Sequence, residues 1–103
     1  MIKWTPKAEK DLEQIIAHIT KSFNPELAFN IVLSLVEFVE TTLSFNPLAG
    51  MILESNPLFS KIIFEGNSIY YCENPRSKDI YVVYVRPRGS EVDSKRLNQN
   101  EVA

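Results

Sequence analysis

The stretch from Leu58 to Arg88 reads LFSKIIFEGNSIYYCENPRSKDIYVVYVRPR, and it carries most of the information about the fold. Three runs rich in Ile, Val, Tyr and Phe are separated by two turn signals. The first signal is Gly66-Asn67, in which glycine supplies the positive φ that a two-residue hairpin turn requires. The second is Asn74-Pro75-Arg76-Ser77, in which proline presets φ and donates no hydrogen bond. The pattern predicts an antiparallel three-stranded meander, with strands at about 59–65, 68–73 and 79–86.

The register of the first hairpin divides this meander into two faces. If Gly66 and Asn67 are the turn residues, Ile63 faces Tyr70 and Lys61 faces Cys72. The opposite face is apolar or aromatic throughout and is expected to contact helices: Ile62, Phe64, Ile69 and Tyr71. With the third strand added, the first face is expected to be open and to collect cations and tyrosines: Lys61, Tyr70, Tyr84, Arg86 and Arg88. Such a face suits an anion, a nucleic acid or an acidic protein segment. The alternative is a solvated face whose charges prevent edge-to-edge pairing.

Two helical patterns precede the meander. Thr5-Pro6 and Asn24-Pro25 each combine a good N-cap with proline at the first helical position, which predicts helices over about 6–21 and 25–44. The polar side of the first helix is expected to be solvated: Lys7, Asp11, Gln14 and His18. One apolar stripe of the second helix is expected to face the sheet: Leu27, Ile31, Leu35, Phe38 and Thr42. A second stripe needs either the first helix or a partner chain to cover it: Phe29, Leu33, Val36 and Leu43.

The order of these elements indicates one α+β domain, an N-terminal helical hairpin packed on a small antiparallel β-sheet. Residues 1–90 are the predicted domain and 91–103 a polar tail, with an edge-strand candidate at 1–4 and a loop at 48–57. The 103 residues carry a formal net charge of −2, which argues against a strongly cationic nucleic-acid binder. No signal-peptide pattern is visible, and no stretch approaches the roughly 18 apolar residues of a membrane span. A cytoplasmic protein without membrane contact is therefore expected.

Residues suited to catalysis or metal binding are sparse. The sequence contains one histidine, His18, and one cysteine, Cys72, and neither stands in a recognisable catalytic pattern. Glu9, Asp11 and Glu13 lie on different faces of the first helix, so they are not expected to share a metal ion. No Gly-rich phosphate loop is present. We therefore expect no cofactor and no metal, and assign no confident catalytic residue.

Several short segments resemble the RelE/ParE toxin superfamily, the toxin halves of bacterial type II toxin–antitoxin modules. WTPKAEKDL at residues 4–12 is similar to the superfamily's opening, and Asn24-Pro25-Glu26 to the start of its second helix. FNPLAG at residues 45–50 is similar to the segment between its helices and its sheet, and residues 69–71 and 82–88 to its two central strands. The similarity spans about residues 2–92 and implies a small antiparallel sheet packed on a helical hairpin.

The resemblance implies one of two activities. RelE-like members cut messenger RNA on the ribosome, whereas ParE-like members inhibit DNA gyrase and are not nucleases. Of the cations that RelE-like members use, two are matched here, by Lys61 and Arg88. Uncharged or acidic residues stand where a second lysine, another arginine and a C-terminal tyrosine are expected: Ile63, Ser68 and Asp93. Phosphodiester cleavage needs an acid or base and cations that stabilise charge on the phosphate, so the resemblance favours the ParE-like branch.

Three hypotheses follow. The first is a ParE-like toxin that inhibits DNA gyrase through the basic end of the sheet and the C-terminal tail, chiefly through Arg86 and Arg88. Its cognate antitoxin is expected to bind either the second stripe of the second helix, at Phe29, Leu33 and Val36, or the sheet. The second is a RelE-like messenger-RNA endonuclease in which Lys61 and Arg88 are catalytic. The third is a non-toxic interaction module on the same fold. The oligomeric state is open between a homodimer and a hetero-oligomer with the antitoxin.

Overall fold

The structure is a computed structural model that describes residues 1–92 and Leu97. In chain order the elements are β1 (Ile2–Trp4), α1 (Pro6–Ser22), α2 (Pro25–Phe45), β2 (Met51–Ile52), β3 (Phe59–Phe64), β4 (Asn67–Glu73) and β5 (Ile80–Arg86). Both predicted helices and all three strands of the predicted meander are present, which confirms the α+β class. Most of the predicted polar tail lies outside the described residues.

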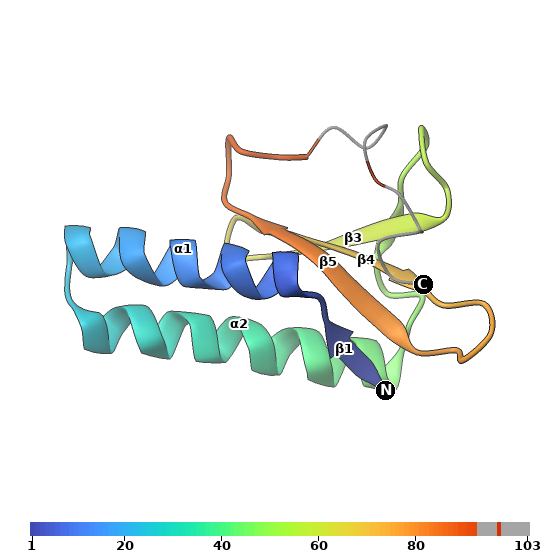
Figure 1. Cartoon of the computed structure of the whole chain (residues 1–103), viewed down its shortest axis with the longest axis horizontal. Helices are drawn as coiled ribbons and strands as arrows, with labels where there is room; N and C mark the ends of the chain where they lie inside the picture. The colour runs from blue at the N-terminus through green and yellow to red at the C-terminus, as the bar shows by residue number, and fades with distance from the viewer. Residues whose placement is uncertain (93–96, 98–103) are drawn as a thin grey trace.

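Each helix begins at the predicted cap. The side-chain oxygen of Thr5 accepts a hydrogen bond from the Ala8 N–H at 3.2 Å, and that of Asn24 accepts one from the Leu27 N–H at 2.8 Å. These contacts satisfy backbone donors that have no partner within the helix. The two helices form an antiparallel pair whose closed end extends beyond the sheet (Figure 1).

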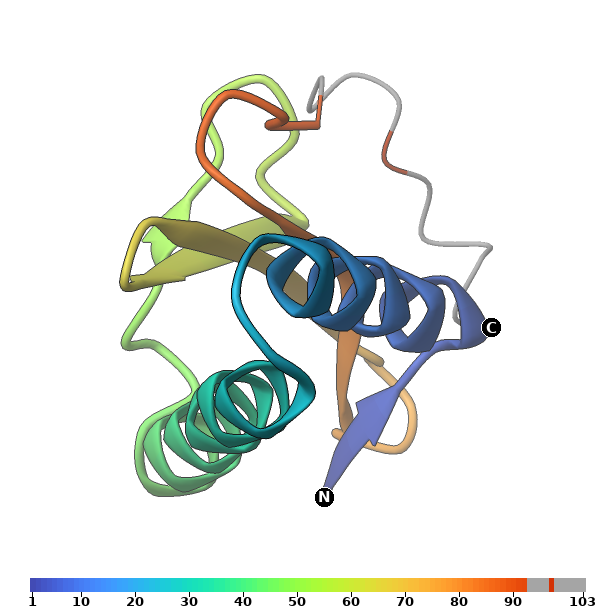
Figure 2. The ribbon, with the colours of Figure 1, turned by 90° about the vertical axis from the view of Figure 1, so that its left-hand side faces the viewer.

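The sheet has five strands in the order β1-β5-β4-β3-β2. The β3-β4-β5 meander is antiparallel as predicted, and β1 joins it in parallel along the edge of β5. The expectation of a loop over residues 48–57 is wrong in part, because Met51 and Ile52 form the short edge strand β2 opposite Lys61 and Ser60. Figure 2 looks along the helices and shows β1 and β2 at opposite edges of the sheet.

The first hairpin turns one residue earlier than predicted. Phe64 pairs with Asn67, so the turn residues are Glu65 and Gly66, with φ of 49° and 84°. Lys61 consequently faces Tyr70 rather than Cys72. Moving the turn by one residue shifts the pairing by two, and because side chains alternate with a period of two, every residue keeps its predicted face.

The face that was predicted to be apolar is the one covered by the helices. Ile62, Ile69 and Tyr71 are buried in the main core together with residues of both helices. The predicted sheet-facing stripe of α2 is wrong in its position, because the fully buried line of that helix is Ala28, Val32, Leu35, Val39 and Leu43. Each predicted stripe contributes one residue to this line, Leu35 and Leu43, and the other residues of both stripes flank the line and are half-buried or exposed.

The opposite face of the sheet is not open, contrary to the sequence-based expectation. Tyr70 is only 2% exposed and forms a second core with Phe59, Cys72, Val83 and Leu97. A register irregularity between Tyr70 and Tyr71, opposite β5, allows Val83 and Tyr84 both to contribute to this second core. The segment that follows β5 also closes over this face, since the Val92 N–H donates to the Tyr70 hydroxyl at 3.2 Å.

Helix α2 is the one described helix that has the length and hydropathy of a membrane span, with 21 residues. Its buried line packs in the main core of the domain, and its exposed side carries Glu26, Glu37 and Glu40. A helix that packs in a protein core and has apolar residues on both flanks reaches the same length and hydropathy as a membrane span.

Candidate target-binding site

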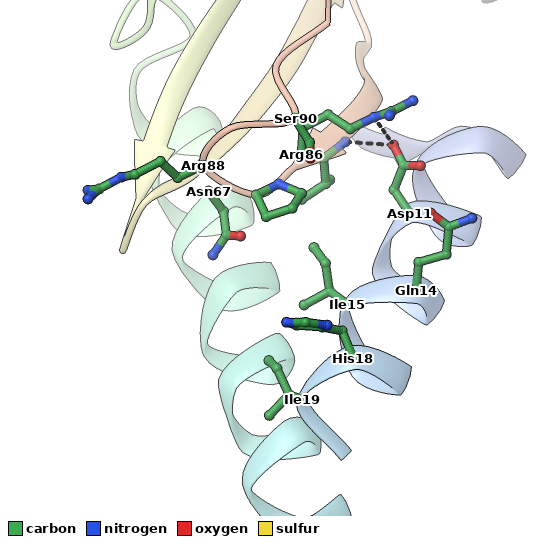
Figure 3. A pocket seen from close by; sticks show the side chains of 11 residues that line it. Asp11, Gln14, Ile15, His18, Ile19, Asn67, Arg86, Arg88 and Ser90 are labelled. Atoms are coloured by element: carbon green, nitrogen blue, oxygen red, sulfur yellow. Dashed lines mark hydrogen bonds and ion pairs between the residues drawn. The ribbon is translucent and has the colours of Figure 1, made fainter. Parts of the chain in front are cut away.

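The cationic end of β5 is held by a carboxylate of α1. Asp11 is 2% exposed, which contradicts its predicted place on a solvated helix face. One oxygen accepts a hydrogen bond from the Val85 N–H at 3.0 Å and lies 3.3 Å from Nε of Arg86, and the other lies 2.6 Å from Nζ of Lys7. Figure 3 shows these contacts between α1 and the end of the sheet. A buried carboxylate is tolerated when hydrogen bonds and opposite charges compensate it in this way.

Two cations lie against the ring of Tyr84. The guanidinium of Arg86 is 5.2 Å from the ring centroid, and the ammonium of Lys7 is 5.5 Å from it. Both distances are within the range of a cation–π interaction. The prediction that Tyr84 and Arg86 lie together is confirmed, but both are already engaged within the protein, and Arg86 pairs with Asp11.

Lys61 and Arg88 lie near one acidic residue, Glu91, which follows β5. Backbone N–H groups of Glu91 itself and of Gly89 lower the pKa of the Glu91 carboxyl, and the charges of Lys61 and Arg88 lower it further. Arg88 is exposed and in Figure 3 points away from Asp11. Half-buried Lys61 and exposed Arg88 are therefore close enough to act electrostatically on Glu91, and neither contacts Asp11.

A cavity of about 530 Å³ lies in the corner between α1 and the end of the sheet. Its α1 side includes Ile15, His18 and Ile19, and its sheet side includes Asn67 and Pro87. Figure 3 shows His18 and the two isoleucines directed toward this corner. The corner combines an apolar floor with a polar rim, a lining that is common in protein binding sites.

The residues that depart from the RelE-like cation pattern are neighbours in space. Ile63 on β3 pairs directly with Ser68 on β4. Ile63 is 57% exposed and Ser68 is buried. Neither can carry positive charge, and the nearest cation in the register is Arg86, which pairs with Ser68 from β5. Asp93 lies outside the described residues.

The predicted partner surface on α2 is exposed in part. Phe29 and Leu33 are 62% and 45% exposed, whereas Val36 is half-buried and packs against the main core. Within residues 1–92 and Leu97, no group of three or more His, Cys, Asp and Glu side chains is arranged to hold a metal ion.

Sequence reasoning missed Lys7 and Asp11 as members of the site. Their spacing of four residues permits an ion pair on one helix face, but the same spacing is common on solvated surfaces. The contact that decides their role joins Asp11 to Val85, 74 residues away in the chain.

Most of the chain matches one known protein family. Residues 2–92 match the family described as the ParE toxin of the type II toxin–antitoxin system parDE. The chain belongs to the ParE toxin family. No curated protein sequence matches this ParE-family chain.

Three solved structures resemble the ParE-family chain. One, described as a chromosomal ParDE toxin–antitoxin system from P. aeruginosa, is 28% identical with a TM-score of 0.74, and the match covers 84% of this chain and 94% of that one. The toxin–antitoxin complex RelBE2 from Mycobacterium tuberculosis is 20% identical with a TM-score of 0.65, covering 85% and 96%. A conserved hypothetical protein from Helicobacter pylori is 17% identical with a TM-score of 0.52, covering 100% and 98%. The latter two likenesses concern the fold alone.

Proposed function

We propose that this ParE-family chain inhibits DNA gyrase by binding to it, and that a cognate antitoxin neutralises it by binding to α2. The observation that carries the choice of gyrase over RNA cleavage is the pairing of Ile63 with Ser68. Two of the positions at which a RelE-like nuclease has cations are here uncharged and adjacent. Cleavage of a phosphodiester depends on several positive groups around the phosphate, and this site lacks two of them.

The engagement of Arg86 supports the same choice. Its guanidinium pairs with the buried carboxylate of Asp11, so its charge is largely compensated within the protein. Lys61 and Arg88 remain as exposed or half-exposed cations of the predicted target-binding set, with Glu91 beside them. A surface with two cations and one carboxylate suits a contact with another protein. It is less suited to stabilising the negative charge that develops on a phosphate during cleavage.

An antitoxin partner is supported by the exposed apolar flank of α2. Phe29 and Leu33 are large apolar residues that the domain itself leaves uncovered, and such residues in a contiguous group commonly mark a protein interface. The ParDE structure at 28% identity is described as a toxin–antitoxin system. We therefore propose that the antitoxin buries Phe29 and Leu33.

The test of the gyrase proposal is supercoiling by purified gyrase with increasing amounts of the folded chain, with cleaved DNA scored in the same gel. Inhibition or trapped cleavage complexes at near-stoichiometric amounts are expected. Pre-incubation with the antitoxin should remove the effect. Full supercoiling at a tenfold excess of folded protein would overturn the proposal.

A RelE-like nuclease is the second candidate, and the observation that favours it is that Lys61 and Arg88 stand at two of the positions where RelE-like members have cations. It predicts translation-dependent cleavage of messenger RNA that is lost in Lys61→Ala and Arg88→Ala. Intact transcripts during growth arrest would remove this candidate. Normal growth on expression of the chain alone would instead favour a non-toxic interaction module.

A further inference from the structure

The edge of β5 changes its partner along its length. β1 pairs with β5 as far as Val82, and Thr5 continues the contact: its N–H donates to the Val82 carbonyl at 3.1 Å and its hydroxyl to the Val83 carbonyl at 3.4 Å. Thr5 is also the N-cap of α1, so the chain turns away from β5 at this point. On this edge of β5 no strand lies beside Val85, and its N–H donates instead to Asp11 in the second turn of α1.

Asp11 thus takes the place of a strand where β1 has ended. A backbone N–H that is buried without a partner is costly, and so is a buried carboxylate. The contact between Val85 and Asp11 satisfies both groups at once. Lys7 and Arg86 supply the remaining compensation of the carboxylate's charge.

The two arginines at the end of the sheet consequently differ. Nε of Arg86 is buried and makes no aligned hydrogen bond, so its ion pair with Asp11 at 3.3 Å is the interaction that compensates it. Arg88 lies two residues further on, is exposed, and points away from Asp11. Arg86 therefore stabilises the fold through its ion pair with Asp11, whereas the exposed side chain of Arg88 is accessible to a partner protein.

We propose that Asp11 is a positioning residue for the cationic end of the sheet, and that Arg88 rather than Arg86 is the cation presented to the target. Asp11 fixes Val85 and Arg86 to α1, and Pro87 then limits the directions in which Arg88 can project. This inference deepens the proposed function and rests on it only for the target-binding measurement below.

The placement of β5 can be tested without any target. Asp11→Asn keeps a carbonyl oxygen that can accept from Val85, whereas Asp11→Ala does not. We expect the Val85 amide to exchange with solvent at least about tenfold faster in Asp11→Ala than in the unmodified protein, and much less so in Asp11→Asn. The Leu35 amide in the buried line of α2 reports global opening, and Val85 exchange should accelerate by more than Leu35 exchange. Equal Val85 exchange in all three proteins would overturn the role of Asp11.

The presentation of Arg88 is tested by the concentration that half-inhibits gyrase, with growth inhibition measured in parallel. Arg88→Ala should weaken inhibition about tenfold without lowering the melting temperature, because an exposed side chain is removed. In an Asp11→Ala background the same substitution should add little, because Arg88 is then no longer held in place. Additive effects of the two substitutions would overturn the positioning role.

A control separates this inference from the proposed function. Arg86→Ala should lower the melting temperature, since it leaves the buried Asp11 with one charged partner fewer. If the unmodified protein does not inhibit gyrase, the proposed function fails, while the Val85 exchange measurement still decides whether Asp11 positions the strand. An unchanged melting temperature in Arg86→Ala would contradict the structural role of that arginine.

Discussion

A single hydroxyl group, that of Tyr71, holds the loop that leads from α2 into β2. It accepts a hydrogen bond from the Gly50 N–H at 2.9 Å and donates one to the Pro47 carbonyl at 3.0 Å. A Cβ on Gly50 would overlap this oxygen and lie 2.7 Å from a ring carbon. Any larger residue at position 50 would displace the loop or the Tyr71 ring, which gives the glycine of the FNPLAG segment a physical explanation.

The contact predicts a coupled pair of substitutions. Gly50→Ala should lower the free energy of unfolding by about 2 kcal/mol through overpacking, and Tyr71→Phe by about 1 kcal/mol through lost hydrogen bonds. The double variant should lose less than the sum, because removing the hydroxyl relieves part of the overlap. Urea unfolding of the four proteins measures the coupling. Strict additivity would show that the alanine is accommodated by a shift of the loop instead.

The buried thiol of Cys72 predicts a pH dependence. Burial raises the pKa of Cys72 from its ordinary value of 9.0 to about 11. Because the folded state binds this proton more tightly than the unfolded state, its contribution to stability is complete below pH 9 and is lost as the pH rises toward 11. Unfolding free energies measured across this range should fall more steeply in the unmodified protein than in Cys72→Ala. Parallel pH profiles would contradict the raised pKa.

At the scale of elements, the β3–β4 hairpin contains a residue that does not suit its turn. Glu65 and Gly66 both have positive φ, which a two-residue type I′ turn requires, and asparagine adopts this conformation more readily than glutamate. Glu65→Asn should therefore raise the free energy of unfolding by roughly 0.5 kcal/mol. Glu73→Asn at the far end of β4 is a matched control without positive φ. A destabilised Glu65→Asn variant would indicate that Glu65 makes a contact that matters more than its backbone.

The same turn shows how far the sequence determines the elements. Helix starts were predictable because Thr5 and Asn24 act locally as caps, and the meander because its apolar runs are long. The turn was predicted one residue late because Asn67 is a more typical turn residue than Glu65. The prediction followed this turn propensity, whereas the turn in the structure is set by the pairing of Phe64 with Asn67. β2 was missed because two exposed residues carry no periodic pattern.

The candidate site was less predictable than the elements, again for a physical reason. Strand alternation alone assigned Lys61, Tyr84, Arg86 and Arg88 to one face of the sheet together with Tyr70, but it could not show that this face is covered. The burial of Tyr70 depends on residues after β5 that fold back, including Val92 and Leu97. The role of Asp11 depends on where β1 ends beside β5. Both are contacts between distant parts of the chain, which a local pattern does not contain.

At the scale of the whole molecule, the two proposed binding surfaces lie on different elements. The apolar one is on α2, and the cationic one follows β5. The net charge of −2 is a property of the whole chain and says nothing about either surface. The two surfaces differ in their residues, which are apolar on α2 and cationic after β5. Binding to the antitoxin and binding to gyrase should therefore respond to different substitutions.

Substitutions on α2 test this separation. Phe29→Ser and Leu33→Ser should each weaken antitoxin binding at least about tenfold, because each removes a large apolar contact from the proposed interface. The two side chains are 62% and 45% exposed, so stability should fall by less than about 1 kcal/mol. Val36→Ser is the contrasting variant, since Val36 packs against the main core and its loss should lower the melting temperature. Calorimetric titration with the antitoxin and supercoiling assays on the same proteins give both affinities. Unchanged antitoxin affinity in the Phe29 and Leu33 variants would place the antitoxin elsewhere, and a parallel loss of gyrase inhibition would mean that one surface serves both partners.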